Sequence, residues 1–545
     1  MLARAASSSR HRPRPRLRSV ACVVGVALVF AAACSSSDGG GDPGGGAPSR
    51  IDKPQPTPMA PLGSAVTTVE ATLVPAKPRQ SYKDGPNPGT NVDALASYLD
   101  RGFGELASAA GQPYVTRVLD GSAAGAPGAP PAAGPNARRI VRFAHLSDMQ
   151  VVDDESPTRL GLYDSADITS SALRPHDAYL CRMTNAAVRT INALHRTDPV
   201  AFTLLGGDNA DSAQSNEIDW VLQILAGSPL VQCDSGDVDD PVPGADNDGK
   251  DPFVAEGLLM PWKWNTGNHD VLITGNLAIT EAHKAAAIAD SPNGGTRDYR
   301  SGGAITTEAI VADPRRAPLT RAELIAKVAS HGDGHGLGPE QRASGRATYA
   351  FDVEGTPLRF LVIDTAHETG GSDGVIKQSY VSSAIKPLLD KAQADGKWVV
   401  LASHHAVSAL TLDGGAFGKA EPDALLPDAW AAFVGGYPNV VLSMVGHAHQ
   451  NRARAISPAG GHAWWEVMSA SIADFPHQLR VVEIYDQDNG WIMVRAAAVD
   501  FGVDSDGVAK EGRRRGTVDL TSGWLPDGPS KPEDRNVELW LEKPR

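Results

Sequence analysis

The sequence predicts a layered fold that mixes α-helices and β-strands. Short apolar runs typical of buried strands recur between residues 139 and 500, and amphipathic helical patterns lie between the first of them. Five of these runs are each followed directly by a small cluster of polar side chains. Because ligands of layered α/β folds bind beyond the carboxyl ends of strands, we expect the five clusters to meet in one crevice.

The first part of this region alternates strands and helices. Strands are expected at residues 140–146 and 200–205. Between them, apolar residues recur at helical spacing over residues 180–194. A second helix is expected at residues 218–225, and Gly227 is a suitable residue to end it.

The later part carries further strands and a closing hairpin. Four more short apolar runs indicate strands, at residues 258–264, 358–363, 398–402 and 440–445. Two alternating segments then indicate an antiparallel pair, at residues 480–484 and 491–498.

The N-terminus predicts export. A basic stretch precedes an apolar run at residues 20–33, which is short for a spanning helix and is typical of a signal peptide. The run ends in Ala31-Ala32-Ala33-Cys34, which resembles a bacterial lipobox in which Cys34 becomes the lipidated first residue. We therefore expect an extracytoplasmic protein anchored to the cell membrane through a lipid on Cys34. Plain secretion is the alternative.

Composition divides the rest of the chain. Residues rich in Gly, Ser, Asp and Pro cannot form a core and predict a flexible tether. The polar C-terminal residues are expected to wrap the surface. The expected organisation is a signal peptide at 1–33, a flexible linker at 34–66, an N-terminal extension at 67–138, a main domain at 139–500 with insertions at 209–262 and 271–346, and a tail at 501–545.

Charge and cysteine content limit the function classes. The formal net charge is −14 over 545 residues, which disfavours nucleic acid as a partner because phosphate binding needs basic surface. A small phosphate substrate stays compatible, since bound cations can invert a local field. Outside the cytoplasm disulfides persist, so Cys181 and Cys233 are a candidate pair. The sequence offers no cysteine at metal-ligand spacing.

The polar clusters after the strands contain metal-ligand side chains. The candidate ligands are Asp148, Gln150, Asp208, Asn268, His404, His447 and His449. Oxygen and imidazole donors suit Mn, Fe, Co or Zn in open sites rather than structural zinc. The donors outnumber the needs of one ion, and a carboxylate can bridge two. We therefore expect two divalent ions, whose identity stays open.

The order D-x-[H/Q], GD, GNHD, H and GHxH resembles the calcineurin-like metallophosphoesterase superfamily over residues 139–500. The resemblance implies a double-layered β-sandwich flanked by helices. It also implies that Asp208 bridges the two ions, that Asp148 and His449 hold one ion beside Gln150, and that Asn268, His404 and His447 hold the other. His269 would face the leaving oxygen as a catalytic residue, with Asp270 orienting it.

The implied function is a phosphoesterase that hydrolyses a phosphomonoester or phosphodiester by attack of a metal-bound hydroxide. A small-molecule or lipid-linked phosphate ester is the expected substrate. The pattern departs from the family at Gln150, where histidine is usual and where an amide oxygen is a weaker donor. That departure gives weight to an alternative, a cell-surface binding protein with weak or no catalysis. The tyrosine of the purple acid branch is missing, because Asn209-Ala210-Asp211 follows the GD motif.

Other polar residues have structural and functional interpretations side by side. His145 is expected in the core, His405 beside the metal ligand His404, and Asp364 as a hydrogen-bond partner. Either support of the site or a helix cap is open for Asp211. His331 and His335 could belong to a lid or to a surface loop. Residues 473–477 could form a pocket wall or a simple turn. For residues 246–249, a solvated acidic insertion is favoured over a calcium loop.

Overall fold

The computed structural model describes residues 50–80, 95–119, 129–159, 161, 172–291, 293–295, 306–308, 310–525 and 530–544. The expected signal peptide and Cys34 lie outside these residues. The described chain combines helices with several β-sheets, so the expected mixed class of α and β structure is confirmed.

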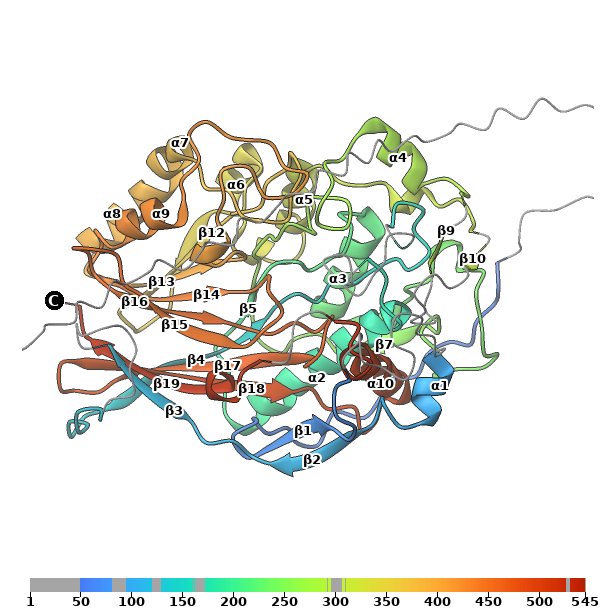
Figure 1. Cartoon of the computed structure of the whole chain (residues 1–545), viewed down its shortest axis with the longest axis horizontal. Helices are drawn as coiled ribbons and strands as arrows, with labels where there is room; N and C mark the ends of the chain where they lie inside the picture. The colour runs from blue at the N-terminus through green and yellow to red at the C-terminus, as the bar shows by residue number, and fades with distance from the viewer. Residues whose placement is uncertain are drawn as a thin grey trace, which may run out of the picture. The chain divides into compact units, whose positions relative to one another are not determined.

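Two larger sheets dominate the structure (Figure 1). One has six strands in the order β11 (Tyr349–Asp352), β12 (Leu358–Ile363), β13 (Trp398–Ser403), β14 (Val440–Val445), β16 (Trp464–Met468) and β15 (Arg452–Ile456). The other has seven, in the order β3 (Val115–Leu119), β19 (Asn536–Glu542), β18 (Trp491–Asp500), β17 (Gln478–Asp486), β4 (Arg138–Leu146), β5 (Thr203–Leu205) and β8 (Trp262–Lys263). Strands β4, β5 and β8 run parallel to one another, and so do β12, β13, β14 and β16. Strands β17 and β18 form the expected antiparallel pair.

The two sheets share one hydrophobic core. Phe143 of β4 packs edge-to-face on Phe360 of β12, with 5.2 Å between ring centroids, and Phe202 contacts both rings. Phe360 and Val362 face this shared core, whereas Leu361 and Ile363 face a second core on the other side of the strand. The two-residue period of a strand therefore sorts one apolar run into two cores.

Helices cover the outer faces of both sheets (Figure 1). The second core joins the six-stranded sheet to α8 (Lys386–Ala394) and α9 (Pro427–Val434) through Leu389 and Trp430. On the other sheet lie α2 (Leu180–Thr197), α3 (Ser215–Ala226) and α10 (Gly507–Thr521). Helix α3 ends at Gly227 as predicted, in a backbone conformation with φ of 87°.

Smaller elements complete the described chain. They are β1 (Ala71–Pro75), α1 (Leu95–Asp100), β2 (Leu106–Ala110), β6 (Ser228–Val231), β7 (Phe253–Ala255), α4 (Glu281–Ala287), β9 (Asn293–Gly295), β10 (Thr306–Glu308), α5 (Arg321–Ala329), α6 (Pro339–Ser344), α7 (Gln378–Tyr380) and α11 (Pro532–Arg535). Strand β1 pairs with β2, β6 with β7, and β9 with β10.

The N-terminal and C-terminal segments do not have the structures expected for an extension, a linker and a tail. Strand β19 from the tail lies between β18 and β3, so residues from both ends complete the seven-stranded sheet. The expectation of a surface-wrapping tail is therefore wrong: α10 and β19 bury apolar residues such as Leu520 and Leu541. The linker expectation is also wrong from residue 50 onward, because Lys53 is buried and pairs with Asp234.

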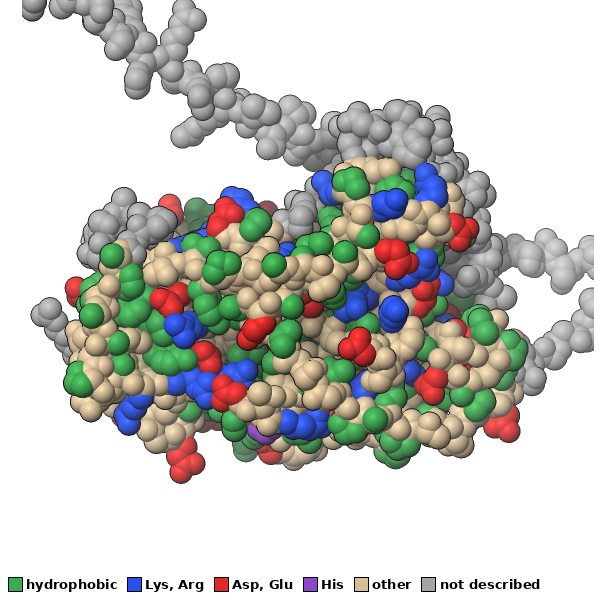
Figure 2. All heavy atoms as spheres, turned by 90° about the horizontal axis from the view of Figure 1, so that it is seen from below, with side chains coloured by type: hydrophobic (Ala, Val, Ile, Leu, Met, Phe, Trp, Pro, Cys, Tyr) green, Lys and Arg blue, Asp and Glu red, His purple; other side chains and the backbone are tan. Residues whose placement is uncertain are grey.

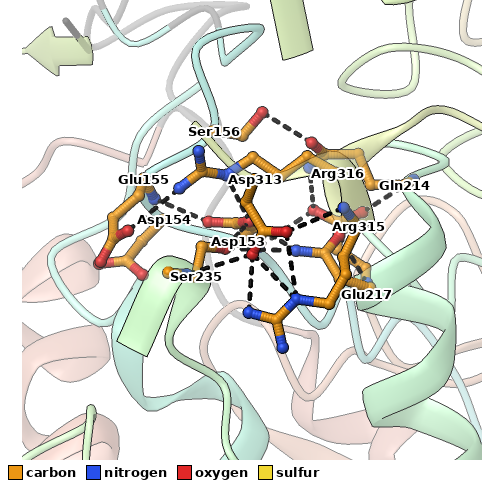
Figure 3. Close-up of polar contacts among 12 residues, drawn as sticks. Asp153, Asp154, Glu155, Ser156, Gln214, Glu217, Ser235, Asp313, Arg315 and Arg316 are labelled. Atoms are coloured by element: carbon orange, nitrogen blue, oxygen red, sulfur yellow. Dashed lines mark hydrogen bonds and ion pairs between the residues drawn. The ribbon is translucent and has the colours of Figure 1, made fainter. Parts of the chain in front are cut away.

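The two insertions pack on each other through a buried polar network (Figure 3). Asp153 follows β4 and accepts hydrogen bonds from Asn216 and Ser235 of the first insertion and Arg316 of the second. Arg316 also reaches Glu155, with 3.1 Å between Nη2 and Oε2. The loop after β4 is thus held by both insertions.

The first insertion is tied down further than its sequence suggests. Cys181 of α2 and Cys233, the candidate pair named from the sequence, form a disulfide. In the acidic loop, Asp248 and Asp251 are buried and, with Asp240, offer carboxylate oxygens within 4.8 Å of one another. The expected solvated loop therefore holds only in part: residues 245–247 are exposed, whereas Asp248 and Asp251 are buried, and Asp251 accepts hydrogen bonds from the backbone of Asn247 and Asp248.

Candidate metal centre

Neighbouring parallel strands bring the predicted ligands together. Asp148, Asp208 and Asn268 follow β4, β5 and β8, whose carboxyl ends meet at one edge of the seven-stranded sheet. His404 and the His447–His449 pair follow β13 and β14, which are parallel neighbours in the other sheet. The strand ends therefore bring candidate donors from both sheets close together.

Hydrogen bonds join the strand-end loops within and between the sheets. The N–H groups of Asp148 and Gln150 donate to the carbonyls of Gly207 and Asp208, at 3.0 and 2.9 Å. Between the sheets, His404 Nδ1 donates to the Gly206 carbonyl at 2.8 Å, and His447 N–H donates to Asp148 Oδ1 at 3.1 Å. The donors are thus fixed by backbone contacts before any ion binds.

Left-handed backbone conformations concentrate at the predicted ligands. Positive φ values occur at Asp148 (51°), Gln150 (42°), Asp208 (52°), His447 (74°) and His449 (54°). Residues other than glycine adopt this region at a cost on the order of 1–3 kcal/mol each, and such residues cluster at functional sites. The loops therefore accept strain at the positions where the side chains must turn inward.

The donor atoms lie close together and are almost fully buried. His404 Nε2 is 3.0 Å from Asp208 Oδ2 and 4.0 Å from Asp148 Oδ1, and His449 Nε2 is 3.2 Å from Asp148 Oδ1. Asp148, Asp208 and His404 offer ligand atoms within 4.8 Å of one another. Buried charges of this kind need a partner or a metal ion.

Two candidate ligand atoms make no hydrogen bond to the described part of the chain. Asn268 donates through Nδ2 to the Gly275 carbonyl at 2.9 Å, while its buried Oδ1 has no hydrogen-bond partner there. His404 uses Nδ1 for the Gly206 carbonyl, and its Nε2 lies beside Asp208 Oδ2 without forming a hydrogen bond. Buried polar atoms are rarely left this way, so these lone pairs fit a divalent ion.

Burial and neighbouring side chains shift the pKa values of the acidic and imidazole groups in the centre. Burial would raise the pKa of Asp208, but the rings of His404 and His269 hold it below its ordinary value. Burial together with the nearby His404 lowers the pKa of His447 to about 3, which leaves that ring neutral. Neutral imidazole is the form that ligates metals.

His269 and Asp270 turn to different partners. His269 Nδ1 donates to the Asp211 carbonyl at 2.7 Å and lies 3.4 Å from the Asp211 carboxylate. Asp270 instead accepts N–H groups of Asn209, Ala210 and Gly267, at 2.9, 3.0 and 2.8 Å. The prediction that Asp270 orients His269 is therefore wrong. Asp211 orients the ring, while Asp270 joins the GD and GNHD loops.

Gln150 is engaged by a residue that sequence reasoning missed. Arg174 Nη2 donates to Gln150 Oε1 at 2.6 Å, and Arg174 Nε donates to Asp474 Oδ1 at 2.6 Å. Asp474 also accepts from His449 Nδ1 at 2.6 Å. Residues 473–477 thus form a turn, closed by the His477 N–H on the Asp474 carbonyl, whose Asp474 side chain reaches the centre. No motif marks Arg174, which precedes α2 in a loop; the only sequence signal was the polar turn around Asp474.

The remaining candidates take structural roles. His145 is buried and bonds Ser469, and Asp364 accepts backbone N–H groups, both as expected. Both ring nitrogens of His405 are engaged, by Thr365 and Ser372, which leaves His404 as the candidate ligand of the pair. His335 stacks on Trp262 with 3.2 Å between centroids, so neither a lid nor a surface loop describes it. Gln214, not Asp211, caps α3.

Comparisons with known proteins add little. No protein-family model and no curated protein matches the sequence. One solved structure with similarity is titled GAP50, the anchor in the inner membrane complex of Plasmodium; it is 12% identical, covers 72% of this chain and 98% of its own, and has a TM-score of 0.26. A similarity of that size carries no functional argument. Of the helices in the described residues, none has the length and apolar character needed to cross a membrane.

Proposed function

We propose that this chain is a metal-dependent phosphoesterase built on the double-layered sandwich of the calcineurin-like superfamily. The observation that carries the proposal is the set of donors at the strand ends of both sheets, with Asn268 Oδ1 and His404 Nε2 lacking partners among the described residues. Asp208, Asn268, His404 and His447 would hold a divalent ion. Such an ion polarises a phosphoryl oxygen and acidifies a bound water.

His269 is the proton donor in this proposal. Its Nδ1 is occupied by the Asp211 carbonyl, so Nε2 is the nitrogen that faces a substrate. Gly275 keeps space beside it, since a Cβ there would lie 2.3 Å from Nε2. The Asp211 carboxylate stabilises the ring when it carries a proton, and a ring so placed protonates the leaving oxygen.

A small or lipid-linked phosphate ester is the proposed substrate. The net charge of −14 opposes long polyanions. On the face seen in Figure 2, acidic and basic side chains are interspersed and form no basic track. Positive charge near the candidate donors comes instead from Arg174 and from the divalent ion that these donors would bind.

The proposed location is outside the cytoplasm, with the chain anchored through a lipid on Cys34. The motif Ala31-Ala32-Ala33-Cys34 supports it. Cys34→Ser expressed in a bacterium with a lipoprotein pathway should move the protein from the membrane fraction to the soluble exported fraction. Equal membrane association of Cys34→Ser and the unmodified chain would refute the anchor.

The experiment for the function is hydrolysis by the metal-loaded chain. Protein stripped with chelator and reloaded with Mn, Zn, Co or Fe should hydrolyse p-nitrophenyl phosphate or its bis-ester, and chelation should abolish the activity. His404→Gln should lose both ion and activity, whereas His283→Gln on α4 should keep both, because the His283 ring bonds only a nearby carbonyl in the described structure. Failure to hydrolyse either ester with any of the four ions would exclude the enzyme.

A binding protein on the same fold is the second candidate. It is favoured by the contact between Gln150 and Arg174, which places a cationic group on one of the candidate donors. Ion binding without hydrolysis in the same experiment would select this candidate.

A further inference from the structure

The two halves of the donor cluster differ in what their amide oxygens contact. On one side, Asn268 Oδ1 has no hydrogen-bond partner within the described chain, and His404 Nε2 lies 3.0 Å from Asp208 Oδ2. On the other side, Gln150 Oε1 already accepts from Arg174, while His449 Nε2 lies 3.2 Å from Asp148 Oδ1. Only the second half therefore has an amide oxygen that is already bonded to a cation.

The contact between Gln150 and Arg174 fixes which amide atom is used. A guanidinium only donates hydrogen bonds, so the atom that lies 2.6 Å from Arg174 Nη2 is the amide oxygen. The remaining amide nitrogen carries two hydrogens and is not a metal ligand. One lone pair of the Gln150 oxygen is therefore taken by a cationic group, in the position where the family pattern has an imidazole.

Arg174 is held in place on several sides. Its side chain is fully buried, its Nε donates to Asp474 Oδ1 at 2.6 Å, and its backbone N–H donates to Asp177 Oδ2 at 2.7 Å. Its Nη1 lies 3.7 Å from Asp211 Oδ1. A cation placed on Gln150 would stand beside this immobile positive charge, which opposes its binding.

His449 is held between two carboxylates. Its Nδ1 donates to Asp474 Oδ2 at 2.6 Å, and its Nε2 lies 3.2 Å from Asp148 Oδ1. Asp474 in turn is paired with Arg174, so the three residues form one connected chain ending at Asp148. Arg174 therefore acts on this half of the cluster twice, at Gln150 directly and at His449 through Asp474.

We infer that the centre holds one divalent ion, on Asp208, Asn268, His404 and His447, and that the guanidinium of Arg174 takes the electrostatic place of the second. This inference rests on the proposed function. It replaces the expectation of two ions with one ion and one fixed organic cation. Arg174 thereby acts as a positioning residue, because it holds Gln150 and, through Asp474, His449.

Ion counting on the unmodified chain tests this directly. The chain is loaded with excess Mn²⁺, freed of unbound ion by gel filtration, and measured by elemental analysis and electron paramagnetic resonance. We expect about one ion per chain and the resolved hyperfine spectrum of an isolated Mn²⁺. About two ions with an exchange-coupled spectrum would overturn the inference and leave the phosphoesterase standing. Absence of bound ion with Mn, Zn, Co and Fe would overturn both.

Variants add a second measurement. The double variant Gln150→His with Arg174→Met should bind about two ions per chain, because it restores an imidazole and removes the opposing charge. Arg182→Met is the matched control, since Arg182 is equally buried and paired with Asp506, and it should keep the count of the unmodified chain. Asn268→Ala should lose the ion altogether. A count that falls only by half in Asn268→Ala contradicts a single ion, and circular dichroism confirms that each variant is folded.

Discussion

At the scale of single residues, the stretch Gly267-Asn268-His269-Asp270 distributes three tasks over adjacent side chains. Asn268 presents an amide oxygen that lacks a partner in the described structure, His269 bonds Asp211, and Asp270 collects N–H groups of two loops. Gly267 permits this crowding, since a Cβ there would lie 2.1 Å from Asp208 Oδ1. Substitutions of these neighbouring residues should therefore impair different properties of the site.

The residue-scale prediction separates metal binding from proton transfer. Asn268→Ala should lose the bound ion, because it removes a ligand oxygen. His269→Ala should keep the ion and slow turnover by about 10²–10⁴-fold, the range for a lost general acid. Metal content by elemental analysis and kcat on p-nitrophenyl phosphate distinguish the two. Equal loss of metal in both variants would show that His269 is a ligand.

At the scale of elements, the strands that carry the site depend on strands from the chain ends. Strand β4 pairs with β17, β17 with β18, and β18 with β19, which in turn pairs with β3. Val537, Leu539 and Leu541 of β19 face the core. The C-terminal strand therefore supports the sheet whose opposite edge holds Asp148 and Asp208.

Removal of β19 is the element-scale prediction. A chain ending at residue 535 loses three side chains of the main core, and the burial of each stabilises the fold by about 1.5–3 kcal/mol. It also leaves β18 and β3 without the strand that pairs with both. We expect a large fall in Tm or loss of soluble protein. A chain ending at residue 542 keeps the whole strand and serves as the control. The same Tm for both chains would contradict a supporting role for β19.

At the scale of the whole described body, the segment after residue 50 ties the first insertion to the domain. Lys53 Nζ pairs with Asp234 and donates to the Lys250 carbonyl, and both paired side chains are buried. Lys250 in turn reaches Asp154 and Glu155 beside the network of Figure 3. The segment expected to be a free tether is thus part of the folded structure.

Lys53→Met tests this contact. It keeps the aliphatic stem but leaves Asp234 with Lys250 as its nearest cation, at 3.9 Å, so unfolding in urea should show a loss of about 3 kcal/mol. Arg50→Met is the control: Arg50 is 72% exposed in its pair with Asp237 and should cost about 0–1 kcal/mol. Equal stability of the two variants would mean that the pair of Lys53 and Asp234 contributes nothing to the fold.

Local pattern predicted the strands near the site well. Residues 358–363 and 440–445 are strands with the predicted limits, because a short apolar run between polar residues has few other uses. Residues 258–264 shrink to β8 at Trp262–Lys263, because Pro261 directly before it cannot donate a ladder hydrogen bond. Strand β19 was missed, since its residues alternate with Glu538 and Glu542 and read as a polar tail.

The strands could be located from the sequence, because strand direction and the two-residue period are local properties. Their positions also gave the polar residues that follow them, and therefore the set of candidate donors. The partners of those donors became clear only from the tertiary structure. The His269 ring bonds Asp211 rather than Asp270, and Arg174 donates a hydrogen bond to the Gln150 side chain. Such pairings join loops distant in the chain, and their geometry depends on how two sheets pack, which no local pattern encodes.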